Sequence, residues 1–153
     1  MHASRNDSLG FAERTRENLE FILEASRQGQ HVQVVTQLVN SMLGLVVFPW
    51  EALVLDRAKQ VPFNTLAGDG WPRFHVTLGK CDTLYDLLWH LRNAVAHGHM
   101  TYSSDSLIPN DVEIRFEDRK NKTTPVNWVA LLRAEDVKEF CRRFAKFVDD
   151  TIG

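Results

Sequence analysis

A short segment near the middle of the chain holds the side chains best suited to chemistry. Three histidines, His90, His97 and His99, lie close to an arginine and an asparagine, Arg92 and Asn93. An imidazole can take up or release a proton near neutral pH, and a planar guanidinium matches the oxygen atoms of a phosphate group. An amide four residues from an imidazole on a helix can orient its ring. These residue types predict proton transfer at a phosphate ester.

The element that must position these residues is predicted to be a helix ending at His97. Thr83 and Asp86 form the pattern of a capping box, in which hydroxyl and carboxylate satisfy the free amides of the first turn. Gly98 suits the residue after a helix, where the backbone turns left-handed. At about 100° per residue, one side of this helix is apolar and is expected to face a core. That side carries Leu84, Leu87, Leu88, Leu91 and Val95.

The opposite side of the same helix is polar. Asp86, His90, Asn93 and His97 fall within about 60° of one another around the axis. Arg92 lies about 140° from His97, so the two are not expected to meet at one phosphate on a single rigid helix. A second copy related by a two-fold axis would bring the arginine of one chain to the histidine of the other. The geometry therefore predicts a homodimer.

The spacing of apolar residues predicts the elements outside this helix. In chain order we expect a helix over 11–27, a buried helix over 31–57 that Pro49 kinks or ends, a loop over 59–80 with one short strand at 74–78, a hairpin over 112–132 and a helix from Glu135 to Ile152. No repeat or linker interrupts this order, so we expect one domain over residues 1–153. The fold class predicted is mainly α, a helical bundle of four to five helices with a β-hairpin insertion before the C-terminal helix.

The composition limits the classes of protein to which the chain can belong. Its 153 residues are 44% hydrophobic and 25% charged, as in ordinary globular domains. The net charge of −2 excludes a strongly basic surface, although lysines and arginines outnumber acids between Arg115 and Lys146. No apolar run is long enough to cross a membrane, and the start of the chain lacks the pattern of a signal peptide. Cys81 and Cys141 match no metal-binding spacing, so we expect a reduced, cytoplasmic protein.

The string LRNAVAHG at residues 91–98 resembles the HEPN superfamily (higher eukaryotes and prokaryotes nucleotide-binding). Helical-bundle ribonucleases of this superfamily carry an arginine and a histidine with four to six residues between them, and a polar residue follows the arginine. Arg92, Asn93 and His97 match these positions, and GLVVFP at 44–49 is similar to a prokaryotic branch. The resemblance implies a metal-independent endoribonuclease without a cofactor, whose catalytic residues Arg92, Asn93 and His97 form a composite site at a homodimer interface. It also implies a role in phage defence or toxin-type growth arrest.

Each of these residues suits a task in RNA cleavage without a metal. A base must take the 2′-OH proton, an acid must protonate the leaving 5′ oxygen, and a cation must stabilise the phosphorane. His97 can perform either proton transfer, Arg92 can bind the phosphorane oxygens, and Asn93 can orient the imidazole of His97. We expect three neighbours to bind the substrate: His90, His99 and Tyr102.

One position departs from the family pattern. Members that pair with a nucleotidyltransferase antitoxin often have a tyrosine two residues after the histidine, where this chain has His99. The tyrosine is displaced to Tyr102. RNA and a second copy of the chain are therefore more strongly indicated as partners than an antitoxin or a nucleotidyltransferase.

Two other functions are compatible with the sequence. A non-catalytic HEPN-like module that binds RNA, a nucleotide or a protein partner would keep the same helix. A metal enzyme would use His90, His97 and His99 as ligands, but no carboxylate or cysteine lies at ligand spacing beside them. The presence of the arginine, the asparagine and the histidine together favours catalysis.

Overall fold

A computed structural model of the protein describes residues 5–47 and 52–152. Five α-helices, four strands and two short 3-10 helices follow one another along these residues. In chain order they are α1 (Arg5–Arg27), α2 (Val34–Val47), α3 (Ala52–Ala58), η1 (Phe63–Thr65), β1 (His75–Leu78), α4 (Leu84–Ala96), β2 (Met100–Tyr102), η2 (Pro109–Asp111), β3 (Glu113–Asp118), β4 (Trp128–Arg133) and α5 (Ala134–Ile152). The helix predicted over 31–57 corresponds to α2 and α3, and its predicted kink at Pro49 lies outside the described residues.

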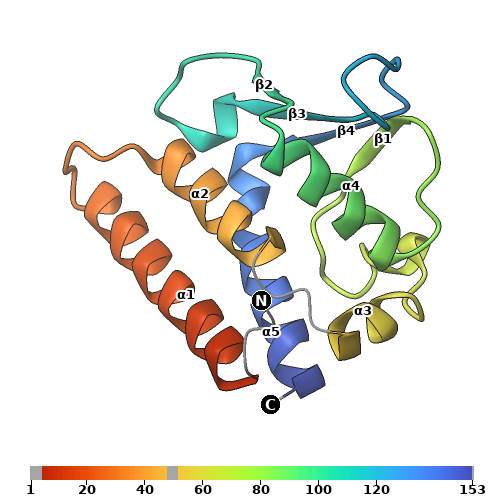
Figure 1. Ribbon diagram of the computed structural model, residues 1–153. Helices are drawn as coiled ribbons and strands as arrows, with labels where there is room; N and C mark the ends of the chain where they lie inside the picture. The colour runs from red at the N-terminus through yellow and green to blue at the C-terminus, as the bar shows by residue number, and fades with distance from the viewer. Residues whose placement is uncertain (1–4, 48–51, 153) are drawn as a thin grey trace.

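The four strands form one antiparallel sheet in the order β1-β4-β3-β2. β3 and β4 are the predicted hairpin, with Glu113 opposite Arg133 and Asp118 opposite Trp128. β1 precedes α4 and β2 follows it, and they complete the two edges of the sheet (Figure 1). The prediction of a mainly α bundle with a hairpin insertion is therefore wrong. The fold is mixed α/β, and the hairpin is the centre of the sheet.

The physical reason for this correction lies in the edges of the hairpin. A two-stranded hairpin leaves a row of unpaired backbone N–H and C=O groups along each edge and is marginal in water by itself. β1 pairs with one edge through residues 75–78, and β2 pairs with the other through residues 100–102. Segments this short carry too few residues for a clear alternation of apolar and polar side chains. The sequence therefore predicts a strand near β1 but none at β2.

The helices build the core against this sheet. α2 packs against α1, α4 and α5, and Leu38, Met42 and Leu45 are at most 1% exposed. The predicted buried helix is confirmed over α2, whose apolar side chains are buried against other helices of the same chain. α4 packs on β3, while α5 follows β4 directly and runs back beside α2 (Figure 1). None of the described helices, the 14-residue α2 included, combines the length and apolar character needed to cross a membrane.

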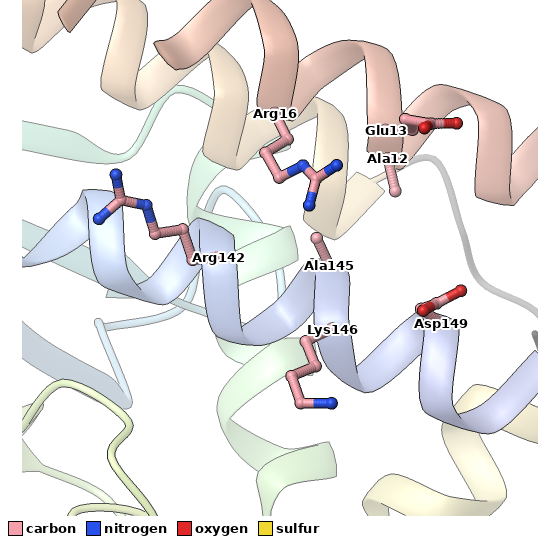
Figure 2. Close-up of a pocket in the computed structure, with 7 residues that line it drawn as sticks. All are labelled: Ala12, Glu13, Arg16, Arg142, Ala145, Lys146 and Asp149. Atoms are coloured by element: carbon pink, nitrogen blue, oxygen red, sulfur yellow. The ribbon is translucent and has the colours of Figure 1, made fainter.

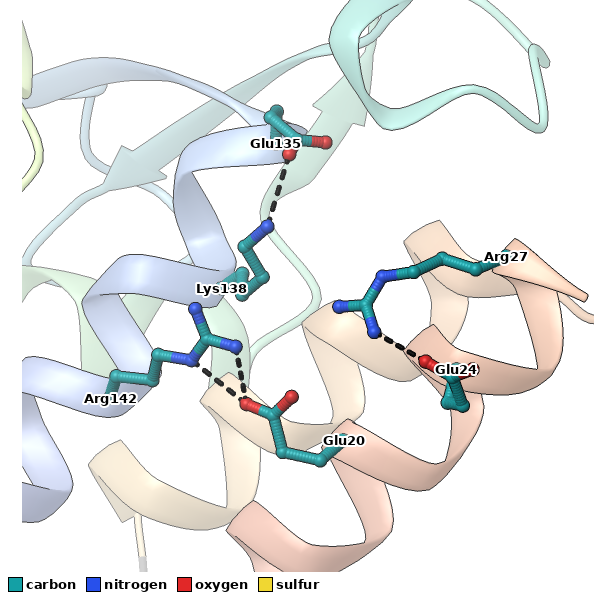
Figure 3. A network of polar contacts seen from close by, with 6 residues as sticks. All are labelled: Glu20, Glu24, Arg27, Glu135, Lys138 and Arg142. Carbon is teal, nitrogen blue, oxygen red and sulfur yellow. Dashed lines mark hydrogen bonds and ion pairs between the residues drawn. The ribbon is translucent and has the colours of Figure 1, made fainter.

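A groove of about 480 Å³ lies between α1 and α5. Figure 2 shows Arg16 of α1 pointing toward α5, with Glu13 and Asp149 farther along the groove. Arg142 bridges the two helices because its Nε donates to Glu20 Oε1 at 2.8 Å (Figure 3). The cations of α5 are thus balanced by acids on the same surface.

Candidate functional site

Both ends of α4 are fixed by hydrogen bonds that the sequence predicts. At its start, Thr83 Oγ1 accepts from the Asp86 amide at 3.2 Å, and Asp86 Oδ2 accepts from the Thr83 amide at 2.9 Å. At its end, Gly98 takes a φ of +68°, and the His99 amide donates to the Ala94 carbonyl at 2.8 Å. This is the Schellman arrangement, in which a left-handed glycine lets the chain leave the helix. The capping box and the C-terminal glycine are confirmed.

The polar side of α4 meets the end of β3 at one buried carboxylate. Asp118 Oδ2 accepts hydrogen bonds from His90 Nδ1 at 2.7 Å and from Asn93 Nδ2 at 3.2 Å. Its other oxygen, Oδ1, accepts from the Arg119 amide at 2.8 Å. Asp118 is 5% exposed, and a carboxylate this buried requires such partners to offset its lost hydration. We call His90, Asn93 and Asp118 the carboxylate cluster.

The ring of His90 is held from a second direction by Trp128 of β4. The two rings stack with centroids 4.6 Å apart and planes inclined by 10°. Trp128 is fully buried, whereas the side chain of His90 retains 20% exposure. Because Asp118 engages Nδ1, the nitrogen of His90 left for other contacts is Nε2.

Arg92 lies on another side of α4, beside aromatic residues. Its Cζ lies 5.9 Å from the centroid of Trp89, and Trp89 stacks on Tyr85 with centroids 6.3 Å apart. Lys59 Nζ lies 5.3 Å from the Tyr85 ring. Trp89 is 42% exposed, so this row of cations and rings reaches the surface. A surface of this kind suits contact with a phosphate chain or with a second protein copy.

His97 follows the last turn of α4 and is exposed. Its ring centroid lies 5.9 Å from that of His99, with the planes tilted by 35°. The side-chain amide of Asn93 bonds to Asp118, so the described hydrogen bond of Asn93 orients the carboxylate cluster and not the ring of His97. The His99 carbonyl accepts from the Glu117 amide at 3.0 Å, which ties the backbone after His97 to β3.

Tyr102 lies away from these groups, on the edge strand β2. It is 45% exposed and lines a groove of about 360 Å³ between α2 and the loop that follows β2, together with Gln33, Thr36 and Asn40. Burial of its hydroxyl raises the pKa of Tyr102. Among the described residues, this groove includes neither His97 nor His99.

The lysines and arginines between Arg115 and Lys146 do not form one cationic surface. They are spread over β3, β4 and α5, and many pair with acids. The pairs are Arg115–Glu117, Arg119–Glu117, Lys138–Glu135, Arg142–Glu20, Arg143–Glu139 and Lys146–Asp150. Lys120 and Lys122 follow Asp118 by two and four residues, in the turn after β3, and no ion pair is found for them among the described residues. The turn that follows the carboxylate cluster in sequence therefore carries positive charge.

Comparison with known proteins identifies the family of the chain. A family model described as HEPN pEK499 p136 matches residues 1–153. The chain belongs to this HEPN family. No curated protein and no solved structure matches it.

The HEPN motif of this chain is divided between two sides of α4. Arg92 lies beside Trp89, whereas His97 lies beside His99 at the C-terminal end of the helix. His90 is joined to Asp118 and thus belongs to neither group. Within the described residues, no three His, Cys, Asp or Glu side chains come together as a metal site would require. The three histidines considered above as ligands are not gathered at one point.

The sequence analysis of this HEPN chain missed two residues of the site, Asp118 and Trp128. Both residues fall in the hairpin predicted over 112–132, but the sequence does not predict that Asp118, the last residue of β3, is buried. Nor does it predict the contact of Trp128 with His90. Their partners on α4 lie 25 to 38 residues away along the chain, and only the docking of α4 on the sheet brings them together. The sequence feature that could have indicated Asp118 is its position, because it is an acid at the end of a strand with alternating apolar and polar residues.

Proposed function

We propose that this HEPN protein is a metal-independent endoribonuclease whose active site forms between two copies of the chain. The observation that carries the proposal is the placement of the HEPN motif on α4. His97 is exposed where the helix ends, and Arg92 lies half-buried beside the exposed Trp89. A second molecule can therefore contact both the histidine and the arginine. On their own chain the two side chains point in different directions around the helix axis.

In a dimer with two-fold symmetry, the arginine of one chain can lie opposite the histidine of the other. Each α4 then offers His97 to one site and Arg92 to the other, and two equivalent sites result. The apolar side of α2 is used inside the chain, so the proposed interface rests on α4 and its surroundings. The exposed ring of Trp89 provides apolar area for that contact.

The proposed reaction is an internal transesterification of RNA. The 2′ oxygen loses its proton and attacks the neighbouring phosphorus, and the bond from phosphorus to the 5′ oxygen breaks. The 5′ oxygen takes up a proton, so the products are a 2′,3′-cyclic phosphate and a 5′-hydroxyl. His97 moves one of the two protons, and the guanidinium of Arg92 stabilises the charge on the phosphorane oxygens.

Incubation of purified protein with RNA in EDTA tests this proposal. We expect wild-type protein to cleave, and His97→Ala and Arg92→Ala to lose about 10²–10⁴-fold in rate, because each removes a group that acts in the transition state. Because His97 is exposed and Arg92 is half-buried, both variants should retain the wild-type melting temperature. Arg92→Ala with full activity would contradict the proposed site, as would a strictly monomeric active protein in sedimentation at tens of micromolar.

The second candidate function is a non-catalytic HEPN module that binds RNA or a protein partner. The aromatic and cationic row of Lys59, Tyr85, Trp89 and Arg92 favours it, because such a row can bind single-stranded nucleic acid without cleaving it. Tight RNA binding without cleavage of any RNA class would favour this module over the enzyme.

A role in growth arrest or phage defence belongs to the same proposal and has its own test. Expression of the wild-type protein in bacteria should slow growth, and His97→Ala should relieve the effect at equal protein level. Slow growth with both proteins would separate toxicity from RNA cleavage.

A further inference from the structure

We propose that His90, held by Asp118, is a second catalytic residue of the HEPN site and acts on the same phosphate as His97. This inference rests on the proposed ribonuclease function and adds the missing partner for proton transfer. Cleavage requires one proton to leave the 2′ oxygen and another to reach the 5′ oxygen, and one histidine cannot do both in a single step. Within each chain, the residues that match the family motif include one histidine, His97.

The orientation of His90 is fixed more completely than packing requires. Its Nδ1 lies 2.7 Å from Asp118 Oδ2, and its ring lies flat against Trp128 at a centroid distance of 4.6 Å. An ionised carboxylate only accepts hydrogen bonds, so the donor–acceptor match places the ring proton on Nδ1. In the neutral ring, Nε2 then carries the free electron pair. Nε2 is thus prepared to act as a base.

Attaching α4 to the sheet through the carboxylate cluster requires the desolvation of a charged side chain. Burying Asp118 requires three donors around its two oxygens, and apolar residues would join two elements without that requirement. Asn93, which follows the motif arginine, contributes one of these donors. We therefore infer that the cluster fixes the orientation of the His90 ring, and that Asp118 and Asn93 are positioning residues.

The spacing of His90 and His97 fits a phosphate between them. His97 is the residue that caps the C-terminal end of α4, seven positions after His90, so about two helical turns separate their backbones by about 10.5 Å along the axis. A base and an acid each about 2.8 Å from their oxygens, with the attacking and leaving groups about 3.5 Å apart, require about 9 Å between the two nitrogens. Residues in this arrangement can contact the 2′ and 5′ oxygens of one linkage.

The step is balanced with His90 as the base and His97 as the acid. His90 Nε2 takes the proton of the 2′-OH as the 2′ oxygen bonds to phosphorus, and protonated His97 gives its proton to the 5′ oxygen as that bond breaks. The two histidines have then exchanged protonation states, and exchange with water restores them. Lys120 and Lys122, in the turn that follows Asp118, are candidates to bind the flanking phosphates.

Mixed dimers test whether both histidines serve one site. His90→Ala and His97→Ala should each lose about 10²–10⁴-fold in rate. A mixture of His90→Ala with Arg92→Ala should recover about a quarter of the wild-type rate, because half of randomly assorted dimers are mixed and each mixed dimer keeps one intact site of two. A mixture of His90→Ala with His97→Ala should stay inactive, since every site then lacks one histidine. Recovery with Arg92→Ala also shows that the His90→Ala chain folds.

A substrate whose leaving 5′ oxygen is replaced by sulfur tests the role of each histidine. A thiolate leaves without a proton, so this substrate should restore cleavage by His97→Ala and not by His90→Ala. Asp118→Asn should lower the rate on both substrates, because an amide in place of the carboxylate can turn a donor toward Nδ1. The control is His31→Ala, an exposed imidazole before α2, which should retain the wild-type rate.

The outcomes separate this inference from the proposed function. If wild-type protein cleaves no RNA, both fail. If wild-type protein cleaves in EDTA and His90→Ala retains at least half of its rate, the ribonuclease stands and the role of His90 is overturned. Recovery in the mixture of His90→Ala with His97→Ala would also overturn it, as would restoration of His90→Ala by the sulfur substrate.

Discussion

Replacing Asp118 with alanine should destabilise the protein strongly, although the residue contributes no apolar side chain to the core. Its carboxylate is the shared acceptor for His90, Asn93 and the amide of Arg119. Asp118→Ala removes all three hydrogen bonds at once. The donors remain where α4, β3 and the following turn meet, and they lose the acceptor that they share.

The expected loss follows from the number of donors. A neutral hydrogen bond contributes about 1 kcal/mol net, and one to a charged group about 1.5–3 kcal/mol. The side chain of His90 is 20% exposed and can regain water, so we take the lower end for each bond and expect a loss of roughly 4–5 kcal/mol. This is a large part of the 5–15 kcal/mol that stabilises a typical domain.

Urea unfolding followed by circular dichroism measures this loss. The matched control is Asp111→Ala, because Asp111 is exposed and accepts from Ser106 Oγ at 3.3 Å. The control should change the free energy of unfolding by at most about 0.5 kcal/mol. If Asp118→Ala costs no more than the control, the carboxylate cluster does not hold α4 on the sheet and the reasoning is refuted.

Three further predictions concern the ends of α4, a tight turn and the thiols. Thr83→Ala removes the N-terminal cap of α4 and should cost about 1 kcal/mol in urea unfolding; a cost near zero would contradict the capping box. Gly98→Ala should cost about 1 kcal/mol because its φ is +68° with open space around it. Gly79→Ala should cost clearly more, since its φ is +82° and its new Cβ would lie 2.6 Å from a backbone carbonyl; equal costs would refute this ranking. Burial raises the pKa of Cys81 and of Cys141 to about 12, so both remain thiols at pH 8. Iodoacetamide should label the buried Cys141 only after unfolding and the half-buried Cys81 slowly, and rapid labelling of Cys141 in native protein would contradict its burial.

Local patterns in the sequence predicted the elements whose signals are contained within a few turns of chain. The cap at Thr83, the glycine at Gly98 and the helix α5 all follow from spacing alone, and Phe140 and Cys141 lie on the buried side of α5. The apolar side of a helix must be covered wherever the helix docks, so it can be predicted without knowing its partner.

Contacts between distant segments were not predictable in the same way. β2 is three residues long, and its pairing depends on the edge of β3 and not on its own composition. The contact of His90 with Asp118 requires that α4 cross the sheet at one particular place. The hypothesis that Asn93 orients His97 used the helix alone, and the structure shows that β3 provides a competing acceptor.

The position of β1 and β2 on opposite edges of the sheet has a consequence for how the protein folds. The chain between them carries α4, so both ends of this segment are anchored only after the β3–β4 hairpin has formed (Figure 1). The hairpin joins neighbours in sequence, whereas β1 pairs with residues more than 50 positions later, and such distant pairings close slowly. We expect β1, α4 and β2 to dock late and to open together in hydrogen exchange. The segment that carries Arg92 and His97 would then be assembled last.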